Sequence, residues 1–241
     1  MKKCFLAVMA VATLVMVGCK NDKKNEPEQQ KDIKEVVAQF NDTIVMSTIM
    51  PGYTTYTVTI DNEANGFIEK DTVFVGCIGE TTLHITADET AKKDVKLTVV
   101  PRLPEEYMFT MPNLDWTRNR AALVKEQGEP DNRIGWENST DSCYAYYRDK
   151  DAAKPFVYYY FNGDNFDTLD EIVVAIDNQE YGDVLKLFVA ERFPFFGKGT
   201  MGNTTVWEYL DAPKRSEATT QVLYYVQSGW NVSFRPYSYG K

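Results

Sequence analysis

The sequence is poor in histidine and cysteine and has fewer basic than acidic residues. Its one histidine is His84, and its four cysteines form no C-x-x-C pair, so the ligand spacing of a zinc site is missing. Lys and Arg number 26 against 35 Asp and Glu, a formal net charge of −9, which excludes the basic surface typical of a nucleic-acid-binding protein. The 241 residues, 44% hydrophobic and 25% charged, have the composition of a globular chain of one or two domains.

The N-terminus has the pattern of a secretory leader. Met1-Lys2-Lys3 is basic, and Cys4 to Val17 form an apolar run that is too short for a comfortable membrane span of ~20 residues. Met16-Val17-Gly18-Cys19 resembles the bacterial lipobox, in which signal peptidase II cleaves before a lipidated cysteine. The resemblance implies a signal peptide over residues 1–18 and acyl chains on Cys19. The alternative is an ordinary secretory signal followed by a chance cysteine.

Lipidation predicts a membrane-anchored protein rather than a freely soluble one. Lys20 follows Cys19, whereas the enterobacterial rule for inner-membrane retention needs Asp there, so the outer membrane is favoured and its periplasmic or outer side is left open. Residues 19–35 are polar and predict a lipidated flexible tether, because they cannot bury enough apolar area to fold. Cleavage removes two lysines, so 24 basic residues face 35 acidic ones and the mature net charge is −11.

Residues 36–102 have the pattern of a small β-sandwich. Short alternating runs end at Ile60, Ile85 and Val99, with Gly and Asn turn signals between them and no helical stripe of useful length. The segment from Val75 to Thr86, followed by Val95 to Pro101, resembles the second half of bacterial Ig-like modules. These carry a Gly-rich turn, a G-x-T-x-I/L strand and a closing V-x-L-x-V strand. The resemblance implies a spacer or stalk, since the fold alone does not give a function.

Residues 107–241 alternate between helix and strand patterns. One helix ends at Gln127, before Gly128 and Pro130, and a second runs from Gln179 to Phe193. Each precedes three strands, so the order helix-strand-strand-strand occurs twice. The predicted fold class is therefore an all-β Ig-like sandwich followed by an α+β domain, with two helix-plus-three-strand units on antiparallel sheet. The expected strands are 142–148, 156–161, 169–176, 205–211, 219–226 and 230–237.

The first of these units, Arg120 to Ile176, resembles the SmpA/OmlA outer-membrane lipoprotein domain. The likeness rests on Leu123-Val124, Gly128-Glu129-Pro130 and the strands Tyr144–Tyr147, Tyr158–Phe161 and Leu169–Ile176. Such units occur in tandem in β-lactamase-inhibitor-like folds, and paired units behind an Ig-like module look like lipoproteins of gut Bacteroidota. The resemblance implies binding or scaffolding rather than catalysis.

No residue pattern points to catalysis or to a metal. His84 lies mid-strand without a suggested Ser or Cys partner, which is typical of a surface histidine. The turn at 162–167 is rich in oxygen ligands but lacks calcium-loop spacing. We therefore predict no catalytic residue, no metal and no cofactor, and we expect Cys77 and Cys143 to be buried free thiols, with a disulfide between them as the alternative. A hydrolase remains a minor alternative on the scattered carboxylates Glu137, Asp141, Asp149 and Asp151.

Aromatic residues concentrate in the second part of the chain. In Tyr158-Tyr159-Tyr160, strand alternation places Tyr159 opposite its two neighbours, so one face packs under the helices and the other exposes tyrosines. Cross-strand packing is the alternative use of these rings. The candidate binding surface that we select from the sequence consists of Tyr144, Tyr146, Tyr159, Tyr225, Trp230 and Tyr237.

The sequence thus predicts a noncatalytic cell-envelope lipoprotein. We expect a protein or glycan partner to bind the C-terminal domain, with the Ig-like module as a spacer, and we expect no nucleic-acid partner. An outer-membrane assembly or structural factor is the second hypothesis, and a hydrolase is the third.

Overall fold

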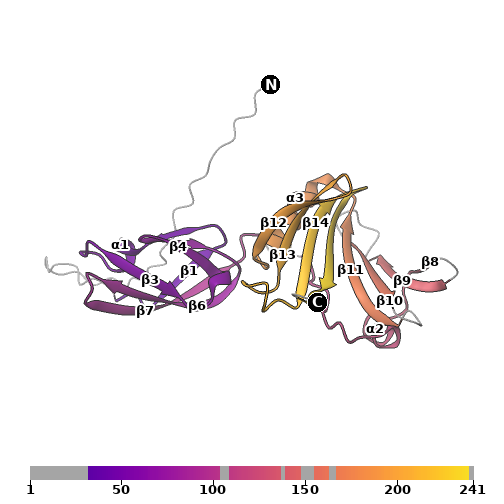
Figure 1. The fold of residues 1–241 in the computed structure, drawn as a ribbon, viewed down its shortest axis with the longest axis horizontal. Helices are drawn as coiled ribbons and strands as arrows, with labels where there is room; N and C mark the ends of the chain where they lie inside the picture. Colours follow the sequence, from indigo (N-terminus) through magenta and orange to yellow (C-terminus); the bar gives the residue numbers. More distant parts are fainter. Residues whose placement is uncertain (1–31, 104–108, 137–138, 148–154, 163–166, 239–241) are drawn as a thin grey trace, which may run out of the picture. The chain divides into compact units, whose positions relative to one another are not determined.

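The computed structural model of the chain describes residues 32–103, 109–136, 139–147, 155–162 and 167–238. The predicted signal peptide, Cys19 and most of the predicted tether lie outside the described residues. The chain divides into two compact units, residues 1–100 and 101–241, and both consist mainly of β-strands (Figure 1).

Two sheets pack face to face in the first unit. One sheet has the strand order β1-β7-β6-β3 and the other β2-β5-β4. Alternation along each strand produces the core, because Leu83, Ile85 and Leu97 of the first sheet and Val73 and Val75 of the second are all buried between them. The elements are β1 (Glu35–Gln39), β2 (Thr43–Val45), α1 (Met46–Ile49), β3 (Tyr56–Ile60), η1 (Glu63–Asn65), β4 (Gly66–Glu69), β5 (Thr72–Val75), β6 (Gly79–Ala87) and β7 (Ala91–Val100).

His84 lies on the exposed side of the four-stranded sheet, between two carboxylates. Its Nδ1 is 2.8 Å from Oδ1 of Asp94, and its Nε2 is 2.9 Å from Oδ1 of Asp61. Only the imidazolium form donates from both nitrogens at once. The hydrogen bond to Asp94, followed by the one to Asp61, accordingly raises the pKa of His84 above its ordinary value of 6.5.

The first unit should therefore become less stable as the pH rises through the pKa of folded His84. Because the folded pKa lies above the unfolded one, the stabilisation is complete below about 6.5 and is lost at higher pH. Thermal unfolding of the mature chain from mildly acidic to alkaline pH measures this loss. His84→Gln should remove the effect, and a decline of the same size in this variant would contradict the assignment.

The second unit consists of one eight-stranded sheet and two helices. The strand order is β12-β13-β14-β15-β11-β10-β9-β8, and neighbouring strands are antiparallel. The elements are α2 (Arg120–Gln127), β8 (Asn132–Trp136), β9 (Ser139–Tyr147), β10 (Phe156–Asn162), β11 (Thr168–Ile176), α3 (Gln179–Ala190), β12 (Phe195–Met201), β13 (Thr204–Leu210), β14 (Thr220–Val226) and β15 (Trp230–Pro236).

Each helix is followed by four strands rather than the predicted three. The strands missing from the prediction are β8 and β12, which form the two edges of the sheet. Phe195–Met201 contains two glycines and is largely exposed, and Asn132–Gly135 is exposed throughout, so neither has the apolar alternation of a half-buried strand. The two halves of the sheet join where β11 pairs with β15.

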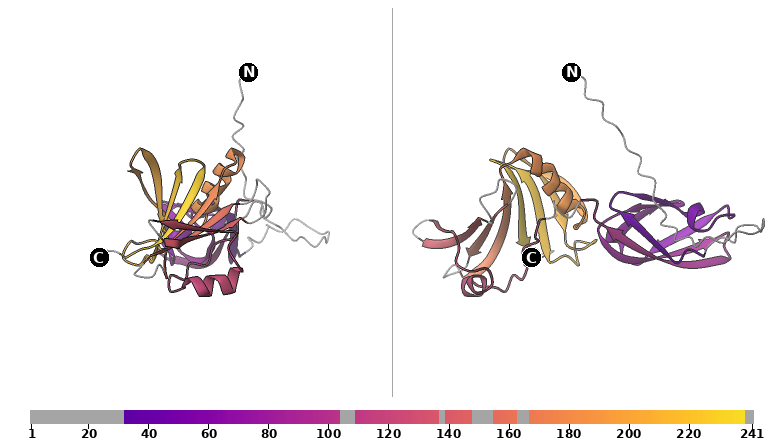
Figure 2. Two further views of the ribbon diagram at one scale, coloured as in Figure 1. Left: turned by 90° about the vertical axis from the view of Figure 1, so that its right-hand side faces the viewer. Right: turned by 180° about the vertical axis from the view of Figure 1, so that it is seen from behind.

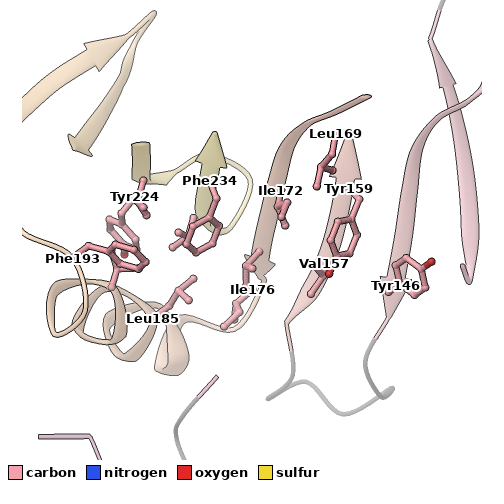
Figure 3. Packing of buried hydrophobic residues seen from close by; sticks show 14 of the residues in the cluster. Tyr146, Val157, Tyr159, Leu169, Ile172, Ile176, Leu185, Phe193, Tyr224 and Phe234 are labelled. Atoms are coloured by element: carbon pink, nitrogen blue, oxygen red, sulfur yellow. The ribbon is translucent and has the colours of Figure 1, made fainter. Parts of the chain in front are cut away.

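Both helices cover the same face of this sheet. Leu123 of α2 and Leu185 and Val189 of α3 belong to one core with Ile172 and Phe234 of the central strands. Figure 3 shows Leu185, Ile172 and Phe234 of this core. Seen from behind, α3 lies across the sheet (right-hand view of Figure 2). The start of α2 is fixed by the Asn119 side chain, which accepts the Ala122 N–H at 2.9 Å, and the helix ends at Gly128, whose φ is 85°. No helix in the described part of the chain is long and apolar enough to span a membrane.

Candidate binding surface

Three of the six aromatic residues selected from the sequence are buried under the helices. Tyr144, Tyr146 and Tyr159 are only 5%, 6% and 1% exposed. Tyr146 and Tyr159 pack edge to face at 5.7 Å, and the Tyr146 hydroxyl donates to the Gly128 carbonyl at 3.1 Å. These residues form no exposed surface, so this part of the prediction is wrong, and cross-strand packing describes them instead.

The register of the strands explains the error. Tyr159 pairs with Ile172 on one side and with Tyr144 on the other, so the three side chains share a face. Ile172, Val174 and Ile176 form the apolar side of β11 that packs under the helices. The prediction that Tyr144, Tyr146 and Tyr159 share one face is correct, but that face is the one covered by the helices.

Of the other three selected residues, one lies on the covered side of the sheet, one follows the last strand and one lies on the uncovered side. Trp230 shares the covered face with Val232 and Phe234 and packs against Gly182 of α3, where an added Cβ would lie 2.3 Å from the indole. Tyr237 follows β15, and its hydroxyl accepts a hydrogen bond from Arg215 at 3.1 Å. Tyr225 lies on the face opposite the helices, because its neighbour Tyr224 belongs to the core.

The face opposite the helices, which we call the open face, carries a different set of aromatic residues. No helix of the described residues lies over it. The strand register assigns it Cys143, Ala145 and Tyr147 of β9, Phe156, Tyr158 and Tyr160 of β10, Glu171, Val173 and Ala175 of β11, Asn231, Ser233 and Arg235 of β15, and Gln221, Leu223 and Tyr225 of β14.

Tyrosines dominate one side of the open face. The rings of Tyr158 and Tyr160 stack with centroids 6.4 Å apart and an interplanar angle of 29°. Tyr160 and Tyr147 are each 38% exposed, and Tyr147 packs edge to face on Phe156 at 5.4 Å. The sequence analysis predicts that one face of the sheet exposes tyrosines, but it does not select these residues.

A charged network lies beside these rings. Oε1 of Glu171 accepts hydrogen bonds from the Ser233 hydroxyl at 2.5 Å and from Nε and Nη2 of Arg235 at 3.0 and 2.7 Å. Tyr225 lies close to this pair: burial raises its pKa, Glu171 raises it further and Arg235 lowers it. The open face therefore presents a paired carboxylate and guanidinium between two groups of aromatic side chains.

The cysteine beneath Tyr160 is a neutral thiol. Cys143 is buried and hydrogen-bonded to Tyr160, and burial raises the pKa of Cys143 to about 11. Burial likewise raises the pKa of Cys77 to about 12. Both cysteines are buried thiols, as predicted, and the alternative of a disulfide between them is wrong. Their raised pKa values mean that neither is a thiolate nucleophile at neutral pH.

The sequence contained a signal for the open face. The alternation of Ile172, Val174 and Ile176 already identifies the covered side of β11. Extending that side to β10 also needs the register in which Tyr159 pairs with Ile172, and that register assigns Tyr158 and Tyr160 to the opposite side. Glu171 and Arg235 had no such signal, because their pairing depends on β11 and β15 being neighbours, which are far apart in the sequence.

The other candidate sites have fewer described polar groups in contact with one another than the open face. A depression of about 520 Å³ beside α2 is lined by Asp167, which is paired with Arg120 at 3.4 Å. Glu137, Asp149, Asp151 and the side chain of Asp141 lie outside the described residues, as does most of the turn at 162–167. Among the residues that the structure describes, no cluster of three His, Cys, Asp or Glu side chains could hold a metal ion.

The described part of the first unit contains an exposed aromatic pair of its own. Phe67 of β4 and Phe74 of β5 stack at 5.2 Å, and Phe67 is 60% exposed. Tyr53, in the same unit, is 39% exposed and matches Tyr160 in residue type and exposure. These residues therefore serve as internal controls for the open face.

Comparison with known proteins identifies no family. No family model and no curated protein matches the chain. Among solved structures, the chain is similar to the structure of the S-layer protein SbsC, domains 5-6, at 12% identity, covering 86% of this chain and 95% of that chain. The TM-score of this match is 0.22, too low to carry an inference about fold or function.

Proposed function

We propose that this chain is a noncatalytic lipoprotein of the bacterial cell envelope that binds a partner through the open face of its second unit. In this proposal the first unit is an Ig-like spacer, and the second is an α+β domain built from a tandem helix-and-sheet repeat. The acyl chains on Cys19 hold the protein at the membrane, with the outer membrane favoured by Lys20.

The observation that carries the proposal is the composition of the open face. Tyr158, Tyr160 and Tyr225 lie on one sheet surface around the Glu171–Arg235 pair, and no described helix covers them. Exposed tyrosine and arginine side chains are enriched where proteins bind partners, because they offer a large apolar area together with hydrogen-bonding groups.

Replacing the lipidation residue should prevent cleavage and acylation of the chain. We expect Cys19→Ser to stop cleavage by signal peptidase II and to abolish the acylated mature form. Mass spectrometry of the purified N-terminus and fractionation of the cell envelope measure the two effects. Detection of an unacylated mature wild-type chain, or of cleavage away from residue 18, would contradict the proposed anchor.

Removing two tyrosines should abolish retention of the partner. The mature chain, immobilised through its C-terminus, is incubated with solubilised envelope from the producing bacterium, and the retained protein and carbohydrate are analysed. We expect Tyr158→Ala/Tyr160→Ala to lose material that the wild type retains, because most binding energy comes from a few central aromatic side chains. Tyr53→Ala is the control of equal exposure. Equal retention by all three chains, or retention by none, would refute the proposed surface.

A further inference from the structure

We infer that the open face binds a neutral oligosaccharide, with sugar rings lying on Tyr158 and Tyr160 and hydroxyls bonded to Glu171 and Arg235. This inference rests on the proposed function and specifies its ligand class. It is carried by three properties of the surface: a pair of nearly parallel rings, a hydrogen-bonding pair beside them, and the absence of net charge on that pair.

The rings provide an apolar platform. Tyr158 and Tyr160 are two residues apart on β10, and their planes differ by only 29°. A pyranose ring has C–H groups on its faces and hydroxyls around its edge, so an exposed aromatic ring contacts the face while leaving the hydroxyls free. The stacked pair offers a sugar a larger apolar area than either ring would alone.

The polar groups have unused hydrogen-bonding capacity. All three bonds to Glu171 from Ser233 and Arg235 use Oε1, and Oε2 accepts none from a described residue. Arg235 bonds through Nε and Nη2, which leaves Nη1 without a described partner. A free carboxylate oxygen accepts from one hydroxyl, and a free guanidinium nitrogen donates to the next.

The charge of the surface favours an uncharged ligand. Glu171 is paired with Arg235 at 2.7 Å, and further along the sheet Glu208 is paired with Arg215 at 2.8 Å. Glu171 and Glu208 are thus each matched by an arginine, so neither pair carries a net charge that would attract an ion. The net charge of −11 predicted for the mature chain would in addition repel acidic polysaccharides.

The arrangement of polar and apolar groups argues against a protein partner. Interfaces between proteins place apolar side chains at the centre and polar ones at the rim. Here Glu171, Ser233 and Arg235 of the central strands β11 and β15 lie between the tyrosines of β10 on one side and Leu223 and Tyr225 of β14 on the other. A dry protein interface would desolvate the Glu171–Arg235 pair at a cost, whereas sugar hydroxyls replace the water that they displace.

The test is calorimetric titration of the mature full-length chain with neutral hexasaccharides, namely cello-, malto-, xylo- and mannohexaose. Hexagalacturonic acid serves as the acidic comparator. We expect at least one neutral hexasaccharide to bind with an affinity that changes little between low and high salt.

The variants test which residues bind the sugar. Tyr160→Ala should weaken the binding of that hexasaccharide about tenfold or more. Glu171→Gln, which keeps the side-chain shape, should weaken it several-fold, and Tyr53→Ala and Phe67→Ala should leave it unchanged. Circular dichroism and thermal unfolding confirm that each variant is folded.

The outcomes separate this inference from the proposed function. Failure of all four neutral hexasaccharides to bind, stronger binding of hexagalacturonic acid, or loss of binding in Phe67→Ala rather than Tyr160→Ala would overturn the inference. If envelope material is still retained through Tyr158 and Tyr160 in that case, and the material is protein, the proposed surface stands and its ligand is a protein. If that retention also fails, both proposals fall.

Discussion

Tyr159→Ala should destabilise the second unit by about 3–5 kcal/mol, whereas the same change at the next residue, Tyr160, should cost less than about 1 kcal/mol. Tyr159 is 1% exposed, and it packs on Tyr146 in the core. Its removal leaves a cavity that the surrounding strands cannot close. Tyr160 lies on the opposite face, where water can occupy the space that its ring leaves.

Urea unfolding of the mature chain, followed by near-ultraviolet circular dichroism, measures this difference. Because the two tyrosines are adjacent in the sequence, local sequence context and residue type are matched between the variants. Greater destabilisation by Tyr160→Ala would show that the strand is turned over and that the open face is the one containing Tyr159. Equal destabilisation would contradict the assignment of Tyr160 to an open face.

Gly76→Ala should destabilise the first unit by about 3 kcal/mol, because the new methyl group meets only backbone. An added Cβ would lie 2.5 Å from the Ala64 carbonyl oxygen, 2.9 Å from the Gly66 nitrogen and 3.0 Å from the Asn65 carbonyl carbon. These atoms are held in place, since Gly76 N donates to Asn65 O at 2.8 Å and Cys77 N donates to Ala64 O at 2.7 Å. No rotation of a side chain can relieve the contact.

Hydrogen exchange of the full-length chain locates the effect of this substitution. Amides of β6 and β7 should lose protection in Gly76→Ala, while those of β10 and β15 should keep it, because the chain forms two compact units. Gly197→Ala is the matched control, since no atom lies within 4 Å of its added Cβ. Unchanged protection of β6 in Gly76→Ala would contradict the close packing at this turn.

Local patterns predicted much of the fold. Strands with an apolar side, such as Leu83–Ile85 in β6 and Ile172–Ile176 in β11, were recognisable because a half-buried strand alternates with a period of two. The end of α2 at Gly128 was recognisable because a left-handed backbone conformation favours glycine. Edge strands β8 and β12 were not, because exposed strands bury too little apolar area to impose alternation.

The binding surface depended on information that the sequence holds only weakly. Alternation showed that Tyr159 and Tyr160 point to opposite faces, but a run of three tyrosines has no difference in hydrophobicity to decide which face is covered. Burial of Tyr159 follows from its pairing with Ile172, and pairing is a property of two strands together. The selection of Tyr144, Tyr146 and Tyr159 therefore grouped the correct neighbours on the wrong side.

The sequence by itself determined the leader pattern, the acidic charge and the aromatic strands of the second part, because these are properties of composition and of local order along the chain. Only the tertiary structure decided which tyrosines face solvent and that Glu171 meets Ser233 and Arg235, more than 60 residues away. The physical reason is that strand pairing and helix packing join distant segments, and burial is settled by those contacts rather than by the hydrophobicity of a single residue.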